Sequence, residues 1–159
     1  MPQSRLILAA ASALLGAPAG AADAPARYAD GAKAFADNCS VCHGPSGQGQ
    51  AGLAPPLTVN PGRYVASGDG RRQLADTVLF GMYGQITVAG QKFDFKMPDF
   101  GQLDDASLAA VLNYVAFDVA NAPDGTPMAA ADIADARRTP LTGEQVRNQR
   151  ETLTTALGL

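Results

Sequence analysis

The sequence predicts an all-α fold of three to four short helices, with a small hairpin insertion and a C-terminal helical extension. Two observations support this prediction. Apolar residues recur at helical spacing only in short segments, and a segment rich in glycine and proline, residues 44–70, separates the first two of them. Such a middle region has few side chains with which to fill its own interior. A bulky apolar group should therefore complete the core.

Four segments have the apolar spacing of helices, and these are residues 28–38, 71–80, 104–117 and 142–157. Asp104 is placed to act as the N-cap of the third segment, which has the most regular apolar stripe. Thr142 and Gln145 have the spacing of a capping box at the start of the fourth segment.

The regions between these helices have their own patterns. Residues 86–88 and 93–95 alternate apolar and polar side chains around Ala89-Gly90, which predicts a small hairpin. Residues 121–140 are rich in proline, alanine and aspartate, and we expect them to form a linker to the last helix.

The composition limits the class of protein. Of the 159 residues, 47% are apolar, which is typical of a globular chain and not of a disordered or multi-span membrane protein. Asp and Glu number 15 against 12 Lys and Arg, which gives a formal net charge of −3. Because phosphate binding needs a basic face, this acidic balance argues against nucleic acid as a partner.

The N-terminal residues have the pattern of a secretory signal peptide. Arg5 precedes an apolar run from Leu6 to Leu15, and Ala19-Gly20-Ala21 has the small residues of a cleavage site. The run is too short to cross a hydrocarbon core of about 30 Å. We therefore expect a periplasmic protein with no membrane span after cleavage. The predicted parts are a signal peptide (1–21), a core domain (22–120), and a linker with a C-terminal helical extension (121–159).

Both cysteines and the one histidine lie within five consecutive residues, Cys39-Ser-Val-Cys42-His43. A redox dithiol, a metal site or a covalently bound haem would each use such a group. Thioredoxin-like dithiols lie where a strand meets a helix, whereas an alanine-rich helix precedes these cysteines. Structural zinc needs four ligands, and the chain has no further Cys or His. The pattern C-x-x-C-H is a haem-attachment signature, so we favour one covalent haem c.

The spacing of these residues suits the chemistry of haem attachment. Cys39 and Cys42, three positions apart on a helical turn, can present their sulfurs to the two vinyl groups on one edge of a porphyrin. His43, the next residue, can then bind the iron as the proximal ligand. Covalent attachment also lets a small fold keep its cofactor without surrounding it completely.

A six-coordinate iron needs a second axial ligand, and the chain has no second histidine. Met97 is the main candidate because Pro98 fixes the backbone of its loop. Met82 is the alternative, either as ligand or as a side chain that fills the core. Met128 lies in the expected linker, where we predict it to be exposed.

At this point the chain resembles the class I single-haem c-type cytochromes over about residues 28–120. The resemblance rests on CSVCHG, on the downstream Met97, and on two flanking helices with Gly31, Phe35 and Tyr114. It implies the cytochrome c fold, in which the first and last helices cross closely. Gly31 and Phe35 would then contact Tyr114.

The resemblance also implies contacts around the haem. Pro55, in Pro55-Pro56-Leu57, resembles the proline loop of the family, whose backbone carbonyl accepts a hydrogen bond from the proximal imidazole. The hairpin before Met97 and the tail after Val119 resemble additions in cytochromes that serve periplasmic dehydrogenases. Independently of the family, Arg63 and Tyr64 are candidates to bond the haem propionates, because buried anions need hydrogen-bonded partners.

These residues together predict a function. With His43 and Met97 on the two faces, the iron has no vacant position for a substrate or oxygen. We therefore expect an electron carrier and not an enzyme, with redox proteins such as a dehydrogenase, oxidase or reductase as partners. A haem enzyme or gas sensor with a labile methionine ligand is the alternative, and a thiol oxidoreductase is the third class.

Overall fold

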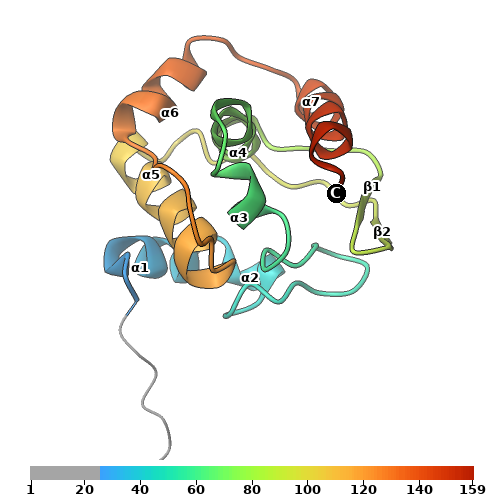
Figure 1. Cartoon of the computed structure of the whole chain (residues 1–159), viewed down its shortest axis with the longest axis horizontal. Helices are drawn as coiled ribbons and strands as arrows, with labels where there is room; N and C mark the ends of the chain where they lie inside the picture. The colour runs from blue at the N-terminus through green and yellow to red at the C-terminus, as the bar shows by residue number, and fades with distance from the viewer. Residues whose placement is uncertain (1–25) are drawn as a thin grey trace, which may run out of the picture.

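The computed structural model of this chain describes residues 26–159. It is mostly helical with one small hairpin, as the sequence predicts (Figure 1). The elements in order are α1 (Ala29–Asn38), α2 (Ser40–His43), α3 (Pro61–Tyr64), α4 (Gly68–Phe80), β1 (Ile86–Val88), β2 (Gln91–Phe93), α5 (Asp105–Asn113), a π-helical segment η1 (Tyr114–Val119), α6 (Ala130–Arg137) and α7 (Gly143–Leu157). The signal peptide expected over residues 1–21 lies outside the described residues. In the described part, no helix has the length and apolar character needed to cross a membrane.

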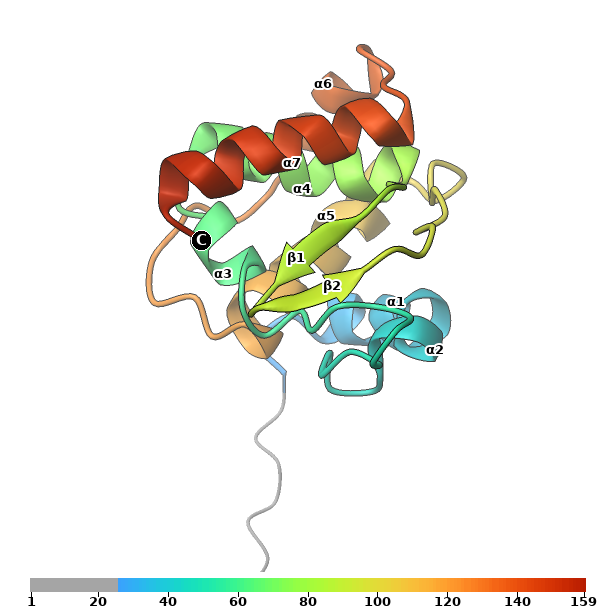
Figure 2. The ribbon, with the colours of Figure 1, turned by 90° about the vertical axis from the view of Figure 1, so that its right-hand side faces the viewer.

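Two groups of helices lie on opposite sides of the hairpin. Helix α7 lies along α4 on one side of the molecule, and α1 and α2 lie on the opposite side (Figures 1 and 2). Figure 2 shows the hairpin β1–β2 between these two groups, and α5 packs on α1 and α6. This arrangement brings residues from most of the chain to one interior.

The crossing of α1 and α5 follows the prediction made from the resemblance. A side chain at Gly31 would place its Cβ 2.1 Å from the carbonyl oxygen of Ala110, so only glycine allows this approach. One turn later, the rings of Phe35 and Tyr114 lie with centroids 5.4 Å apart and planes inclined by 56°. Tilted aromatic pairs of this kind add about 0.5–1.5 kcal/mol beyond their buried area.

The predicted helix caps are present. Asp104 Oδ1 accepts a hydrogen bond from the Ser107 backbone N–H at 2.8 Å, at the start of α5. At the start of α7, Thr142 and Gln145 form both bonds of a capping box, at 3.2 and 2.8 Å. These local side-chain bonds satisfy N–H groups that have no partner within the helix.

The second strand of the hairpin lies two residues earlier than predicted. Ala89 and Gly90 both have positive φ, 49° and 77°, and they form a two-residue turn that pairs Val88 with Gln91. Tight hairpins favour such turns because their twist matches that of the strands. The register that results places Ile86 opposite Phe93.

The segment expected to be a linker contains α6 and adds to the core. Met128 is 5% exposed, so the prediction that it is exposed was wrong. The side-chain amide of Asn113 holds Met128 in this buried position. Its Nδ2 donates to the Met128 carbonyl at 3.0 Å, and its Oδ1 accepts from the Met128 N–H at 2.7 Å. Ile133 and Ala136 of α6 are fully buried in the same cluster as Leu108 of α5.

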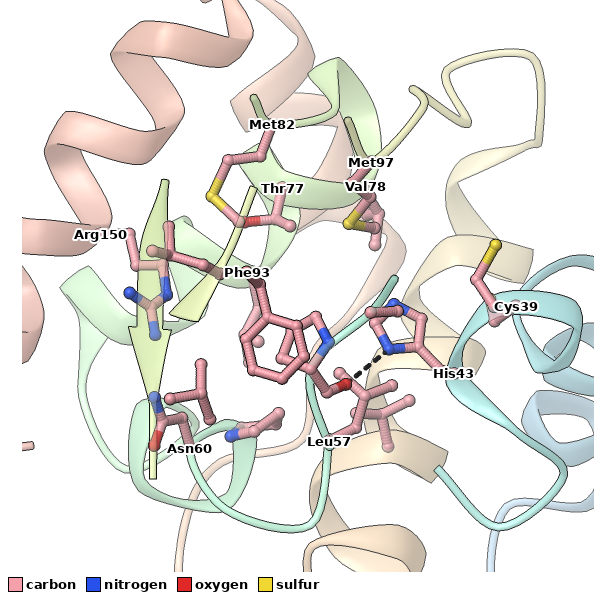
Figure 3. A pocket seen from close by; sticks show the side chains of 18 of the residues that line it. Cys39, His43, Leu57, Asn60, Thr77, Val78, Met82, Phe93, Met97 and Arg150 are labelled. Carbon is pink, nitrogen blue, oxygen red and sulfur yellow. Dashed lines mark hydrogen bonds between the residues drawn. The ribbon is translucent and has the colours of Figure 1, made fainter. Parts of the chain in front are cut away.

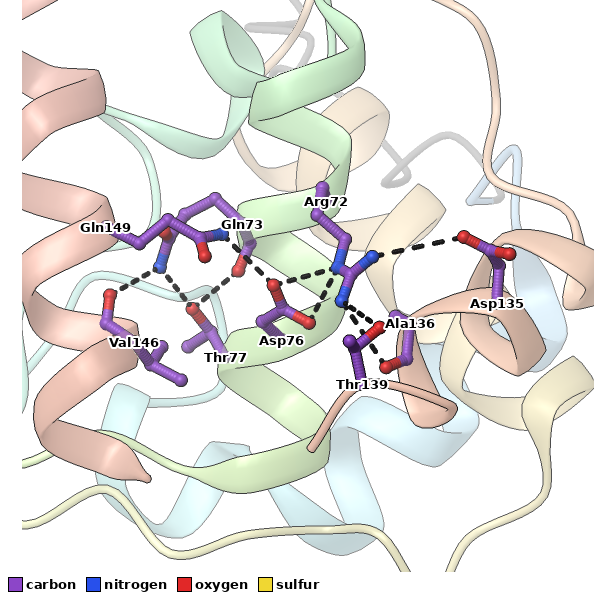
Figure 4. A network of polar contacts seen from close by, with 9 residues as sticks. All are labelled: Arg72, Gln73, Asp76, Thr77, Asp135, Ala136, Thr139, Val146 and Gln149. Carbon is purple, nitrogen blue, oxygen red and sulfur yellow. Dashed lines mark hydrogen bonds and ion pairs between the residues drawn. The ribbon is translucent and has the colours of Figure 1, made fainter. Parts of the chain in front are cut away.

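A buried carboxylate joins α6 and α7 to α4 (Figure 4). Asp76 is fully buried and accepts hydrogen bonds from Arg72 Nε at 2.9 Å and from Gln149 Nε2 at 3.0 Å. The same arginine donates to Thr139 Oγ1 at 3.0 Å, just after α6. One charged pair on α4 therefore fixes the positions of both helices that follow residue 121.

Asp76→Asn should lower the free energy of unfolding by about 2–4 kcal/mol, because it removes the buried charged partner of Arg72 and leaves only the more distant Asp135, at 3.9 Å, as counter-charge. Denaturant unfolding of the haem-loaded protein, followed by far-UV circular dichroism, measures the change. Asp37→Asn is the control, because Asp37 and Lys33 form an exposed pair on α1. Equal losses in the two variants would contradict this role of Asp76.

Candidate haem site

A large cavity lies between α1–α2, α4, the hairpin and α5 (Figure 3). The volume of the cavity, together with the open solvent at its mouth, is about 1200 Å³. Its walls are mainly apolar side chains, among them Leu57, Leu74, Val78, Ile86, Phe93 and Val111.

The structure brings both cysteines and the histidine to this cavity. Cys39 lies between α1 and α2: it is the C-cap of α1, where its N–H donates to the Phe35 carbonyl at 2.8 Å, and the N-cap of α2. The His43 N–H donates to the Cys39 carbonyl at 3.0 Å, so the motif forms one helical turn. Cys39, Cys42 and His43 all line the cavity.

The environment of Cys39 is unfavourable to a thiolate. Burial, with a smaller effect of the neighbouring Cys42, raises the pKa of the Cys39 thiol to about 11. Dithiol oxidoreductases need the opposite, a cysteine whose pKa is lowered so that it attacks as the thiolate. The site therefore does not suit thiol–disulfide exchange.

The imidazole of His43 is buried and oriented by the proline loop. Its Nδ1 lies 2.9 Å from the carbonyl oxygen of Pro55, so Nδ1–H donates there and Nε2 remains available to a ligand. Burial lowers the pKa of His43, and the bond to Pro55 opposes this in part. The imidazole is thus held neutral, which is the form that binds metals.

A glycine allows the proline loop to come this close to the motif. Gly49 has a φ of 76°, and a Cβ there would lie 2.6 Å from the Pro56 nitrogen. Its own N–H donates to the His43 carbonyl at 2.7 Å. The polypeptide's own hydrogen bonds therefore fix the backbone on both sides of His43.

Two methionines reach the cavity from paired backbone segments. The N–H of Met82 donates to the Met97 carbonyl at 3.1 Å, and the N–H of Met97 donates to the Met82 carbonyl at 2.8 Å. Both side chains line the cavity. In Figure 3, Met97 lies across from His43, whereas Met82 lies toward the end that holds Arg150.

The two residues predicted to bond the haem propionates, Tyr64 and Arg63, lie in different surroundings. Tyr64 is buried in the cavity wall, and its hydroxyl oxygen accepts a long hydrogen bond of 3.5 Å from Asn60 Nδ2. Arg63 is exposed, does not line the cavity, and donates to the Leu157 carbonyl at 3.4 Å. Sequence reasoning missed Arg150 of α7, which is 8% exposed and lines the cavity. The weak amphipathic pattern of the last helix does not show which of its charges points inward.

The donors and the cavity fit a haem. Gln73 is 1% exposed in the wall, and its Oε1 has no hydrogen-bond partner among residues 26–159. An unpaired buried amide oxygen costs about 1–3 kcal/mol, which indicates that the complete site holds a further polar group or water. Apolar walls, two thiols, a neutral imidazole and two thioethers match a porphyrin body, and Arg150 and Tyr64 suit a charged edge.

Comparisons with known proteins agree with this geometry. The family model for cytochrome c matches residues 28–116. Two relatives called cytochrome c-552, both from Thermus thermophilus, are 38% identical over 118 residues. That alignment covers 72% of this chain and 90% and 80% of the two relatives.

The fold and the site define a small helical protein with one covalently attached haem. The chain belongs to the cytochrome c family. It is an electron carrier with one haem c and not an enzyme, and redox proteins are its partners.

Thiol titration distinguishes this site from a dithiol centre. In the mature protein, unfolded and reduced, we expect no reaction with a thiol-specific reagent, because a thioether sulfur has no S–H and cannot form the thiolate that such a reagent needs. The two cysteines of the chain would both react if they formed a redox pair. Two reactive thiols per chain in the coloured protein would contradict covalent attachment.

Proposed function

We propose that this chain transfers single electrons between redox proteins of the periplasm and the respiratory chain. In this proposal Cys39 and Cys42 form the thioethers, and His43 and Met97 are the axial ligands of the iron. The main support is that all four side chains line one cavity and that Pro55 fixes His43 with Nε2 available. Pro55 thus acts on the iron through the imidazole.

The backbone around Met97 supports its choice as the second ligand. Both its N–H and its carbonyl are bonded to Met82, and the N–H of Phe100, three residues later, donates to the Val78 carbonyl at 2.8 Å. A ligand held on both sides in this way needs little movement when the iron changes oxidation state. Met82 is the alternative ligand, because its side chain lines the same cavity.

The proposed ligands explain electron transfer and not catalysis. When bound, the haem supplies an iron that gains and loses one electron, and a soft thioether ligand raises its reduction potential. His43 and Met97 would close both faces to substrates and gases. A haem enzyme or gas sensor would instead need one face open, with the methionine displaced.

Location and partners are parts of the same proposal. The pattern of residues 1–21 supports export, with residues 22–120 as the haem-binding part of the mature chain. A dehydrogenase as electron donor is supported only by the resemblance of the hairpin and the tail to additions in cytochromes of that kind. Capture of partners from a periplasmic extract, followed by stopped-flow mixing with each candidate dehydrogenase and oxidase, tests it. Electron transfer to none of them would contradict a carrier role in that compartment.

Met97→Ala should lower the reduction potential by at least about 59 mV, a tenfold change for a one-electron couple, because the loss of the thioether favours ferric iron. It should also remove the sulfur-to-iron charge-transfer band and let carbon monoxide and cyanide bind. Met82→Ala is the matched control and should keep both the band and the closed iron. The reverse result would assign the ligand to Met82, and ready carbon monoxide binding by the unmodified protein would favour the sensor class.

A further inference from the structure

Arg150 is a buried cation that lacks a counter-charge in the described part of the chain. It belongs to none of the ion pairs found in residues 26–159. Within residues 26–159 its guanidinium makes one hydrogen bond, to the Thr87 carbonyl at 3.3 Å. Arginine stays protonated in proteins and has five N–H donors. A buried charge of this kind is strongly unfavourable unless an anion pairs with it.

Among residues 26–159, the wall of the cavity that Arg150 lines contains cationic side chains and no carboxylate. Its Lys and Arg residues are Lys96 and Arg150, and none of its lining residues in that range is Asp or Glu. Tyr64 and Asn60 add a hydroxyl and an amide. Burial raises the pKa of Tyr64, so its hydroxyl keeps the proton and can donate. The polar groups of this wall thus match an anion.

The position of Arg150 indicates which anion this is. In Figure 3, Arg150 and Asn60 lie at one end of the cavity and Cys39 lies at the other. The propionates of a haem stand on the edge opposite the vinyl groups that form thioethers. A haem joined to Cys39 and Cys42 would therefore direct its carboxylates to the end where Arg150 lies.

Helix α7 holds Arg150 in place through neighbours on the same turn. Gln149 donates to the buried Asp76 at 3.0 Å, and the Val146 carbonyl accepts from Gln73 Nε2 at 3.2 Å. Both contacts join α7 to α4, which lines the cavity as well. The guanidinium is thus positioned by packing before the cofactor binds.

We propose that Arg150 binds a propionate of the haem through its guanidinium, with Tyr64 and Asn60 as additional donors. The C-terminal extension is then part of the redox site, because it supplies the counter-charge of the cofactor. This inference rests on the proposed attachment of the haem at Cys39 and Cys42. A cation at the propionate disfavours the oxidised state, so Arg150 raises the reduction potential.

Three variants of the haem-loaded protein test the proposal. Arg150→Met removes the charge, Arg150→Lys keeps the charge but loses the planar fork, and Arg147→Met removes a charge from the same helix outside the cavity. Arg147 is paired with Glu151 at 3.3 Å and does not line the cavity. The readouts are the reduction potential and the propionate bending bands in the resonance Raman spectrum.

We expect Arg150→Met to lower the potential at least twice as much as Arg147→Met and to shift the propionate bands. Arg150→Lys should restore most of the potential while the propionate bands stay shifted, and it keeps the test valid if Arg150→Met does not fold. Equal changes in potential for Arg150→Met and Arg147→Met, or unshifted bands in Arg150→Lys, would overturn the proposal. Intact mass and the charge-transfer band of the unmodified protein show separately whether the haem and its ligands are as proposed.

Discussion

The described chain packs around an apolar space that its own side chains do not fill. Its wall includes the α1–α2 turn, the proline loop, α4, the hairpin and α5, together with Tyr64 of α3, Arg150 of α7 and the paired Met82 and Met97 segments. Apolar side chains that face such a space lack dispersion contacts on that side. A haem c in this space would supply those contacts, and the cofactor would then be at once the functional group and a large part of the core. Short helices and long loops would be sufficient for this chain because the porphyrin would complete their packing.

The C-terminal extension is joined to this core and does not stand apart from it. Asp76 on α4 binds groups that fix both α6 and α7, and Met128 and Ile133 enter the same cluster of buried side chains. Its last helix also brings Arg150 to the cavity. Residues beyond 121 therefore stabilise α4, and in our proposal they also adjust the charge around the haem.

Sequence patterns correctly predicted the features that depend on residues close together in the chain. The cap at Asp104 and the spacing of Cys39, Cys42 and His43 depend on residues a few positions apart, and both are present in the fold. Burial of Met128 could not be predicted, because it depends on an amide fifteen positions earlier, at Asn113. The roles of Arg63 and Arg150 could not be separated either, since a charged residue gives no sign in the sequence of whether it points inward. Helix α6 was missed because proline, alanine and aspartate are also the composition of a linker.

The central claim is that a covalently held haem completes the interior. Hydrogen exchange tests it most directly, by comparing the mature protein with a Cys39→Ser, Cys42→Ser chain made without haem. The account predicts that the haem-free chain loses protection in α1, α5 and the hairpin, which line the cavity from three sides. Equal protection of these elements in the two proteins would contradict it, because the polypeptide would then form its core without the cofactor.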